Sequence, residues 1–215
     1  MEILISTHND ISSIAKCQVI CFPDSFAVKL GSACIEKSLQ WFLANPNRFL
    51  VHVENNGNVI GFVGGFMPQF IGDGSKSGIL NFAIKDAFTG LLRRPNLFFK
   101  KELWFYSIVF IKNKLRLLQK KLTKNKLIVP EEFQDYLHSV AITIIAVHTQ
   151  FRGNGIVDDL LDYVEKFAIT HNKTVLCLGV KQKNIIASRA YERNGWVVDK
   201  QVGDSFVMKK FLKNL

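Results

Sequence analysis

The sequence predicts an α/β (α+β) fold in a single domain that covers residues 1–215. Short β-branched runs alternate along the chain with stretches in which apolar residues recur at helical spacing, and turns rich in glycine or proline separate them. Hydrophobic residues make up 48% of the chain and charged residues 21%, which is ordinary for a globular protein. Disorder and fibrous repeats are therefore not expected, and a chain of this length buries one sizeable core.

The first elements are a short strand and two helices. Ile3–Ile5 is apolar, and Thr7–Asp10 supplies cap-type residues before residues 11–20, whose apolar positions have helical spacing. A second helix is expected over residues 30–43, because Pro46 stops the same kind of pattern.

A β-hairpin is expected next. Residues 49–54 and 59–66 are rich in β-forming side chains, and the Asn-Asn-Gly-Asn segment at 55–58 tolerates the positive φ angles of a tight turn. Three glycines lie in the second strand: Gly61, Gly64 and Gly65. They indicate either a bend or a place where another group lies close to the backbone.

Residues 67–137 differ in character from the rest, and we expect them to form a largely helical insertion. Aromatic residues and leucines are interleaved there with cations, and residues 97–122 suit a helix after the break at Pro95. The net charge of +10 is concentrated in this insertion. Its cations are Lys76, Lys85, Arg93, Arg94, Lys100, Lys101, Lys112, Lys114, Arg116, Lys120, Lys121, Lys124 and Lys126.

The last third of the chain predicts four strands and two helices. Residues 140–147 form a nearly continuous β-branched run, as expected for a buried central strand. The helices are expected at residues 158–170 and 184–194, and the other strands at 174–180, 196–202 and 205–211. Gly195 ends the second helix, and Gly203-Asp204 forms the last turn.

A glycine-rich turn follows the buried strand. The segment Gln150-Phe151-Arg152-Gly153-Asn154-Gly155-Ile156 connects that strand to a helix. Glycines let the backbone turn tightly and approach an anion, and unpaired amides of residues 153–157 donate hydrogen bonds with the helix dipole behind them. The turn is therefore expected either to bind a pyrophosphate or to be an ordinary strand-to-helix connection.

A second motif, Asn184 to Trp196, lies in the last helix. Asn184, Ala187 and Tyr191 fall within two turns and near one face of that helix. Asn184 suits both a helix cap and a ligand contact, and Tyr191 is either a functional phenol or an aromatic ring packed under the sheet.

The order, separation and setting of the two motifs resemble the cofactor signatures of the GNAT superfamily of N-acetyltransferases. The resemblance extends to the order of elements from Ile3 to Phe211, with residues 67–137 as an addition. It implies a mixed, mostly antiparallel central sheet of six to seven strands flanked by helices, with the insertion between strands 3 and 4. It also implies an acyltransferase that moves the acetyl group of its co-substrate acetyl-CoA to a primary amine by direct attack, without a metal.

The resemblance also assigns residues to the cofactor. Ala146 and Val147 would offer backbone groups to the pantetheine arm, Asn184 would hydrogen-bond the cofactor, and Ala187 would leave room for it. The pyrophosphate would lie on the turn, against Gln150, Arg152, Gly153, Asn154, Gly155, Ile156 and Val157. Tyr191 would act as the general acid that protonates the departing CoA thiolate, because attack of an amine on a thioester needs a proton donor near the sulfur.

The attacking amine also needs a proton acceptor. No acid stands at the start of the central strand, so His138 is the nearest titratable candidate. The alternatives are Glu131, Glu132 or Asp135 acting through a water, His148 beside the turn, or an amine that loses its proton to solvent. The helix after the turn departs from the family pattern, because Asp158 and Asp159 place carboxylates beside the expected anion site.

The insertion suggests a partner surface. Its mixture of aromatic rings and cations suits contact with an anionic membrane, and the alternative is that the rings pack on the sheet or close the substrate cleft. The Phe-Pro-Asp-Ser-Phe loop at 22–26, Leu30-Gly31 and the insertion resemble a bacterial GNAT subgroup associated with surface-polysaccharide loci. That looser resemblance implies an amino sugar acceptor, in nucleotide-linked or lipid-linked form. The runner-up function is a catalytically weak acyl-CoA-binding module that docks to a membrane or partner.

The expected partners are a small-molecule amine, an anionic membrane surface and a second copy of the chain in a homodimer; nucleic acid is not expected, since no base-reading module is recognised. Without a signal or membrane-spanning run, the protein is expected in the cytoplasm, at the inner membrane face if it binds lipid. Its cysteines are too few for a disulfide framework: Cys17, Cys21, Cys34 and Cys177. No metal site is expected from them, and His52 is expected in the core or at the surface.

Overall fold

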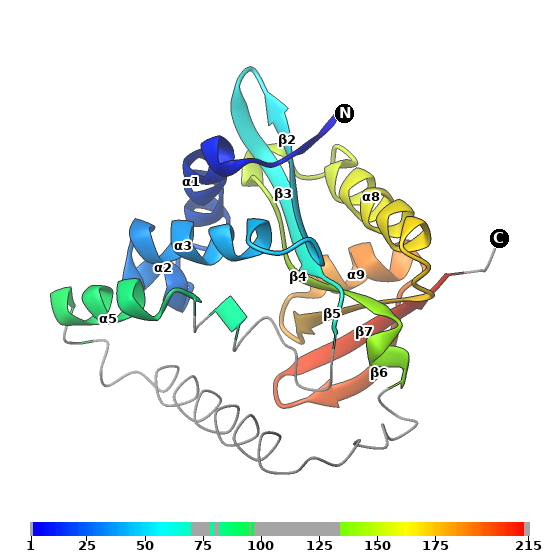
Figure 1. Cartoon of the computed structure of the whole chain (residues 1–215). Coiled ribbons are helices and arrows are strands. Elements are labelled where there is room, and N and C mark those ends of the chain that lie inside the picture. The colour runs from blue at the N-terminus through cyan, green and yellow to red at the C-terminus, as the bar shows by residue number, and fades with distance from the viewer. Residues whose placement is uncertain (1, 70–77, 80–81, 95, 97–133, 213–215) are drawn as a thin grey trace, which may run out of the picture.

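The computed structural model describes residues 2–69, 78–79, 82–94, 96 and 134–212, and within them seven strands form one sheet (Figure 1). The strand order is β1-β2-β3-β4-β5-β7-β6, and only the β4–β5 pair is parallel. The strands are β1 (Ile3–Ile5), β2 (Arg48–Asn55), β3 (Asn58–Phe66), β4 (Ser139–Val147), β5 (Val175–Lys181), β6 (Val197–Val202) and β7 (Ser205–Phe211). The predicted mixed, mostly antiparallel sheet is confirmed.

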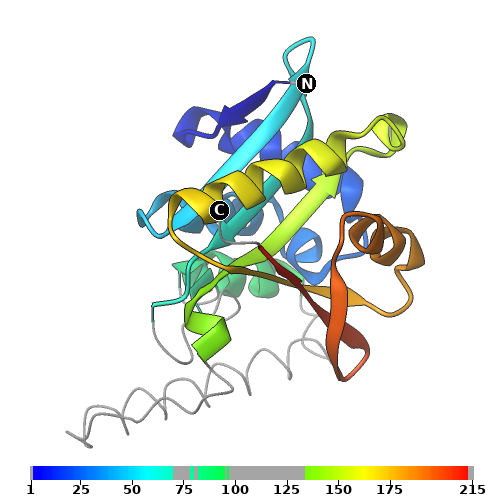
Figure 2. The same cartoon turned by 90° about the vertical axis from the view of Figure 1, so that its right-hand side faces the viewer.

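Helices cover both faces of this sheet (Figures 1 and 2). One face carries α1 (Ile11–Cys21), preceded by the 3₁₀ turn η1 (His8–Asp10), with α2 (Phe26–Leu30) and α3 (Ser32–Leu43). The other face carries α8 (Ile156–Thr170) and α9 (Ile185–Arg193). Within the insertion the structure shows α5 (Ile84–Arg93), and α7 (Gln134–Leu137) leads into β4.

Two expectations about helices need comment. The helix expected over residues 30–43 is observed as α3, and Gly31, with a φ of 107°, separates it from the short helix α2, which was not predicted. The insertion does lie between β3 and β4 and contains a helix at α5, but the helix expected over residues 97–122 lies outside the described residues.

The hairpin forms as predicted. Asn56 and Gly57 take positive φ angles of 50° and 72°, as a tight two-residue turn requires. In β3, a Cβ added at Gly65 would lie 2.5 Å from the Phe49 ring and 2.7 Å from the Ala141 carbonyl oxygen, so the strand packs closely there. A Cβ at Gly61 would lie 2.9 Å from Ile156 Cγ2, so the missing side chain lets the start of α8 pack directly on β3.

A bulge in β4 changes which of its side chains face α8 and which face α1 and α3. The β3 register passes from Gly64↔Ile144 to Gly65↔Ile142 and leaves Thr143 unpaired. Val140 and Ile142 before the bulge pack in the same core as α8, as Ile145 and Val147 do after it. Without the extra residue, strict alternation would turn the last two toward α1 and α3. The bulge thus sets the side-chain directions at the end of β4.

The structure also describes the cysteines and the lengths of the helices. All four cysteines are free thiols, and the Sγ atoms of Cys17 and Cys21 lie 3.9 Å apart on one face of α1. Among the described residues, no helix has the length and apolar character needed to cross a membrane.

Candidate active site

The two parallel strands at the centre of the sheet pair only at their beginnings. The β4–β5 register runs from Ser139↔Val175 to Ile142↔Leu178. Beyond this register, β4 remains paired with β3, and β5 remains paired with β7. The edges of β4 and β5 that face each other are therefore no longer joined by backbone hydrogen bonds. Unpaired backbone N–H and C=O groups are strong hydrogen-bonding groups, and an extended ligand can bind along such an edge.

The glycine-rich turn begins where this open edge of β4 ends. The His148 amide donates to the Ile60 carbonyl over 2.8 Å, and the 3₁₀ turn η4 (Thr149–Phe151) follows. Gly153 and Gly155 take φ angles of 85° and 77°, and Gly155 is the N-cap residue of α8. A Cβ at either glycine would meet no atom within 4 Å, so the space over the turn is open.

The amides of this turn are available to a ligand. Within the described chain, the backbone N–H groups of residues 153–157 donate no hydrogen bond to another residue, as expected for the first turn of a helix. The start of α8 also brings the positive end of the helix dipole to the turn. The Arg152 Nε donates to the Val147 carbonyl over 3.2 Å, which holds the exposed guanidinium beside the turn. Gln150 and Asn154 are exposed there as well.

Asp158, which follows the turn, is paired with the end of α9. Its carboxylate accepts hydrogen bonds from Asn194 Nδ2 at 2.6 Å and from Arg193 Nη2 at 3.0 and 3.1 Å. The hydrogen bond from Asn194, and the hydrogen bond and charge of Arg193, lower the pKa of the Asp158 carboxyl. One of the two carboxylates that depart from the family pattern is therefore paired with a cation, and the pair joins the start of α8 to the end of α9.

The second motif lies on α9 as predicted. Asn184 is the N-cap of that helix, since its Oδ1 accepts a hydrogen bond from the Ala187 amide over 3.3 Å. Its side chain is exposed, and within the described chain its Nδ2 donates to no other residue. Gly195 ends the helix with a φ of 79°.

Tyr191 packs in the same core as the start of α8. Only 7% of the residue is exposed, and its ring centroid lies 6.1 Å from that of Trp196. Burial raises the pKa of Tyr191 to about 12, because the phenolate loses its hydration there. The phenol therefore keeps its proton at neutral pH, as a proton donor must.

The raised pKa of Tyr191 predicts a loss of stability at alkaline pH. A buried neutral phenol contributes its full stability below pH 10, and the contribution is lost as the pH rises from about 10 to about 12. In that window the unfolding free energy of the wild type should fall by about 1.4 kcal/mol per pH unit more than that of Tyr191→Phe. Urea denaturation of both proteins between pH 8 and 11 measures this; parallel curves would contradict the burial of an ionisable phenol.

Two hydroxyl groups near these elements were not expected from the sequence. Thr143 Oγ1, at the bulge of β4, and Ser188 Oγ, on α9 between Asn184 and Tyr191, are buried and have no hydrogen-bond partner among the described residues. A buried hydroxyl without a partner is costly, so each is a candidate to bind a ligand atom. Serine in a helix and threonine in a strand are ordinary, and no sequence signal distinguishes these two.

The structure places His138 away from this group. It is exposed and directly precedes β4, where its carbonyl accepts a hydrogen bond from the Thr174 amide over 3.2 Å. Thr143 is five positions further along, which corresponds to about 16 Å of extended strand, and the glycine-rich turn follows the far end of β4. The other proposed acceptors, Glu131, Glu132 and the Asp135 side chain, lie outside the described part of the chain.

Solved structures of the same fold include acetyltransferases. The sequence model of the Acetyltransferase (GNAT) family matches residues 129–196, which contain both motifs. A GNAT acetyltransferase from Streptococcus pneumoniae is 14% identical, with a TM-score of 0.56 over 99% of each chain. A ribosomal-protein-alanine N-acetyltransferase from Brucella melitensis is 17% identical, with a TM-score of 0.58 over 99% of this chain and 100% of that one.

A third solved structure contains the cofactor. PaiA N-acetyltransferase from Thermoplasma acidophilum, in complex with coenzyme A, is 11% identical, with a TM-score of 0.57 over 98% of each chain. At such identities these likenesses establish the fold. No curated protein matches the sequence significantly. The family match spans both motifs, and the solved structures show that the chain has the fold of GNAT acetyltransferases, a seven-stranded sheet of this topology.

Proposed function

We propose that the protein transfers the acetyl group of acetyl-CoA to a primary amine by direct attack. One observation supports this most strongly: the amides of the Gly153–Gly155 turn, the open edge of β4 and the buried phenol of Tyr191 belong to elements that pack around one core. The turn is suited to bind a diphosphate, and the open edge of β4 is suited to bind an extended chain with amide groups. The phenol is suited to give a proton to a leaving group.

In this proposal the pyrophosphate of acetyl-CoA binds the amides of residues 153–157, with Arg152 beside it. The pantetheine arm then lies along β4, against the backbone of Ala146 and Val147, where β5 no longer pairs. Asn184 donates its free amide to the arm, and the small side chain of Ala187 leaves space for it. We also assign Thr143 and Ser188 to the acetyl-pantetheine end, because both hydroxyls are buried without partners in the part of the chain that the structure describes.

The chemical step needs no covalent intermediate with the protein. The lone pair of a neutral amine attacks the thioester carbonyl, the C–S bond of the tetrahedral species breaks, and the thiolate takes the proton of the Tyr191 hydroxyl. The amine nitrogen loses one proton to solvent, and the phenolate regains one, so the products are the acetamide and free CoA. We propose solvent as the acceptor because His138 lies about 16 Å along the strand from Thr143.

The proposed acceptor is an amino sugar, in free, nucleotide-linked or lipid-linked form. Its support is the resemblance of the 22–26 loop and the basic insertion to proteins of surface-polysaccharide loci. The Brucella melitensis structure belongs to an enzyme named for a protein acceptor, so peptide amines belong in the same test. Release of free CoA thiol should be measured with glucosamine, a nucleotide-linked amino sugar, spermidine and an alanyl peptide, with and without Tyr191→Phe.

Turnover of an amino sugar that depends on Tyr191 supports the proposal. Turnover of only the peptide would overturn the proposed acceptor and keep the acetyl transfer. Saturable acetyl-CoA binding without turnover of any of these amines would instead favour the runner-up function, an acyl-CoA-binding module.

A second function, docking to an anionic membrane, is favoured by one feature of α5. Its small residues Ala83, Ala87 and Gly90 pack on α2 and α3; a Cβ at Gly90 would lie only 2.3 Å from the Leu30 carbonyl oxygen. The neighbouring face exposes Ile84, Phe88 and Leu92, one turn apart, with Phe88 56% and Leu92 62% exposed.

Cations surround this apolar stripe of α5. Lys85, Arg93 and Arg94 are exposed at its border, and Lys37 lies 5.0 Å from the centroid of the Phe82 ring. Apolar side chains bordered by cations match the interface of an anionic bilayer, in which rings enter the acyl boundary and cations meet the headgroups.

Binding to vesicles tests this second function. The protein should sediment with vesicles that contain phosphatidylserine and remain in solution with pure phosphatidylcholine. Phe88→Asp should weaken vesicle binding at least about tenfold, since burial of a phenylalanine ring is worth about 1.5–3 kcal/mol. Phe211→Asp is the matched control, because Phe211 on β7 is 60% exposed. Equal binding to both lipids, or equal loss in both variants, would contradict docking through α5.

A further inference from the structure

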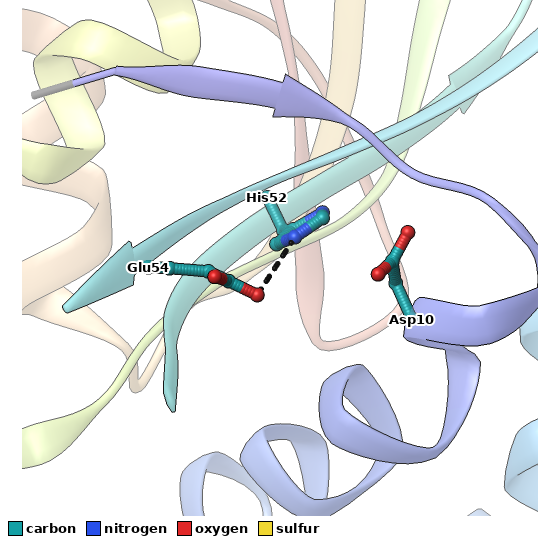
Figure 3. Close-up of side chains that lie close together, drawn as sticks. All are labelled: Asp10, His52 and Glu54. Carbon is teal, nitrogen blue, oxygen red and sulfur yellow. Dashed lines mark hydrogen bonds and ion pairs between the residues drawn. The ribbon is translucent and has the colours of Figure 1, made fainter. Parts of the chain in front are cut away.

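Three side chains of types that can ligate a metal ion converge where β1, α1 and the middle of β2 meet (Figure 3). Asp10 stands at the start of α1, and His52 and Glu54 lie two positions apart on β2. One ligand atom from each residue lies within 4.8 Å of the other two. This cluster is separate from the acetyl-CoA site, because His52 pairs with Phe62 of β3, which in turn pairs with β4, so two strand spacings of about 4.8 Å lie between.

His52 is held as metal-ligating histidines are held. Only 2% of the residue is exposed, and its Nδ1 lies 2.8 Å from the hydroxyl of Ser6, which is also buried. When Nδ1 donates its proton to the Ser6 oxygen, Nε2 presents its lone pair to the cluster. A histidine ligand whose other nitrogen is anchored by a hydrogen bond has a fixed ring orientation and a fixed tautomer.

The two carboxylates lack a permanent counter-charge. Asp10 accepts hydrogen bonds from the Thr7 amide at 2.7 Å and the Thr7 hydroxyl at 2.8 Å, which lock the carboxylate in place. Over the described part of the chain, neither Asp10 nor Glu54 forms an ion pair with a lysine or arginine. Two negative charges therefore face one imidazole.

We propose that Asp10, His52 and Glu54 bind a divalent transition-metal ion, best matched by Zn²⁺. One nitrogen and two carboxylate oxygens are a donor set that zinc accepts. The 3.3 Å between His52 Nε2 and Glu54 Oε1 equals the edge of a tetrahedron with metal–ligand bonds of about 2.0–2.1 Å. Glu54 is partly exposed and provides the path from solvent, and a water completes the coordination. The ion would clamp the first strand and the start of α1 to β2.

Cobalt and zinc binding to the whole protein test this site. After treatment with a chelator, the protein should bind one equivalent of Co²⁺ with the visible absorption of a four-coordinate ion, and Zn²⁺ should displace it with a Kd at or below about 1 μM. The melting temperature of the wild type should rise with the free Zn²⁺ concentration. Glu54→Gln keeps the shape of the side chain and removes one charged ligand, so we expect at least about tenfold weaker binding.

The control is Asp204→Asn, since Asp204 is an exposed carboxylate paired with Lys181 far along the chain. It should bind Co²⁺ like the wild type. Melting curves of all three proteins without metal should coincide, which separates loss of a ligand from loss of the fold. Absence of stoichiometric Co²⁺ binding in the wild type would overturn the proposal. Equal affinity of wild type and Glu54→Gln would overturn it too.

Discussion

Tyr191→Phe should lower the kcat for acetyl transfer by about 10²–10⁴-fold, the usual contribution of a positioned acid or base. The substitution removes only the hydroxyl, while the ring keeps its contact with Trp196 in the core. Binding of acetyl-CoA should change by less than about threefold, because in the proposed mechanism the hydroxyl acts on the leaving thiolate and not on the bound thioester. Steady-state kinetics with varied acetyl-CoA and a saturating amine measures both parameters.

A proton donor with a pKa of about 12 also predicts the pH profile of the reaction. Wild-type kcat should not fall between pH 7 and pH 10, because the phenol stays protonated across this range. Activity in Tyr191→Phe within about twofold of the wild type would show that the phenol is structural, and an alkaline fall centred near pH 8 would assign the proton to another group.

Gly155→Val should weaken the binding of coenzyme A by about 100-fold, equivalent to about 2.7 kcal/mol. Gly155 has a φ of 77°, which a β-branched residue adopts only with strain, and its Cβ would stand in the open space over the amides of the turn. The added side chain should therefore both distort the turn and keep the pyrophosphate away from the donors. Isothermal titration calorimetry gives the change in Kd.

Gly203→Val is a matched control for this glycine. Gly203 lies in the β6–β7 turn with a φ of 60° and, like Gly155, has no atom within 4 Å of an added Cβ. Both variants should lose stability through backbone strain, but Gly203→Val should bind coenzyme A within about twofold of the wild type. A similar loss in both variants would trace the effect to general destabilisation and not to the turn.

Much of this architecture follows from local sequence patterns. The hairpin is predictable because Asn56-Gly57 accepts the two positive φ angles that its turn requires. The end of α9 is predictable from Gly195, and the start of α8 from the glycines before it. Each of these signals acts within a few residues, and the structure confirms each. The short helix α2 is the opposite case, since the sequence does not predict a helix directly before Gly31.

Features that join distant segments were not predictable in the same way. The β-branched run Thr143-Ile144-Ile145 looks uniform in sequence, and only its pairing with Gly64 and Gly65 reveals the bulge. From the sequence, the carboxylate of Asp158 is unfavourable for anion binding. Its partner Arg193 lies on another helix, so only the fold shows that the charge is paired.

His52 looked like a core residue for the same reason. Its partners Ser6 and Asp10 are brought to it by the pairing of β1 with β2 and by the start of α1. The sequence places these residues more than forty positions apart, so only the fold shows the cluster.

A titration of the wild-type protein with coenzyme A tests the central claim most directly. The amides at the start of α8, after the end of β4, should bind the diphosphate. We therefore expect saturable binding of one coenzyme A per chain, and acetyl-CoA should compete for the same site. If the protein is folded in the same buffer and the heats of the titration show no saturation, the proposed binding of coenzyme A at this turn is contradicted.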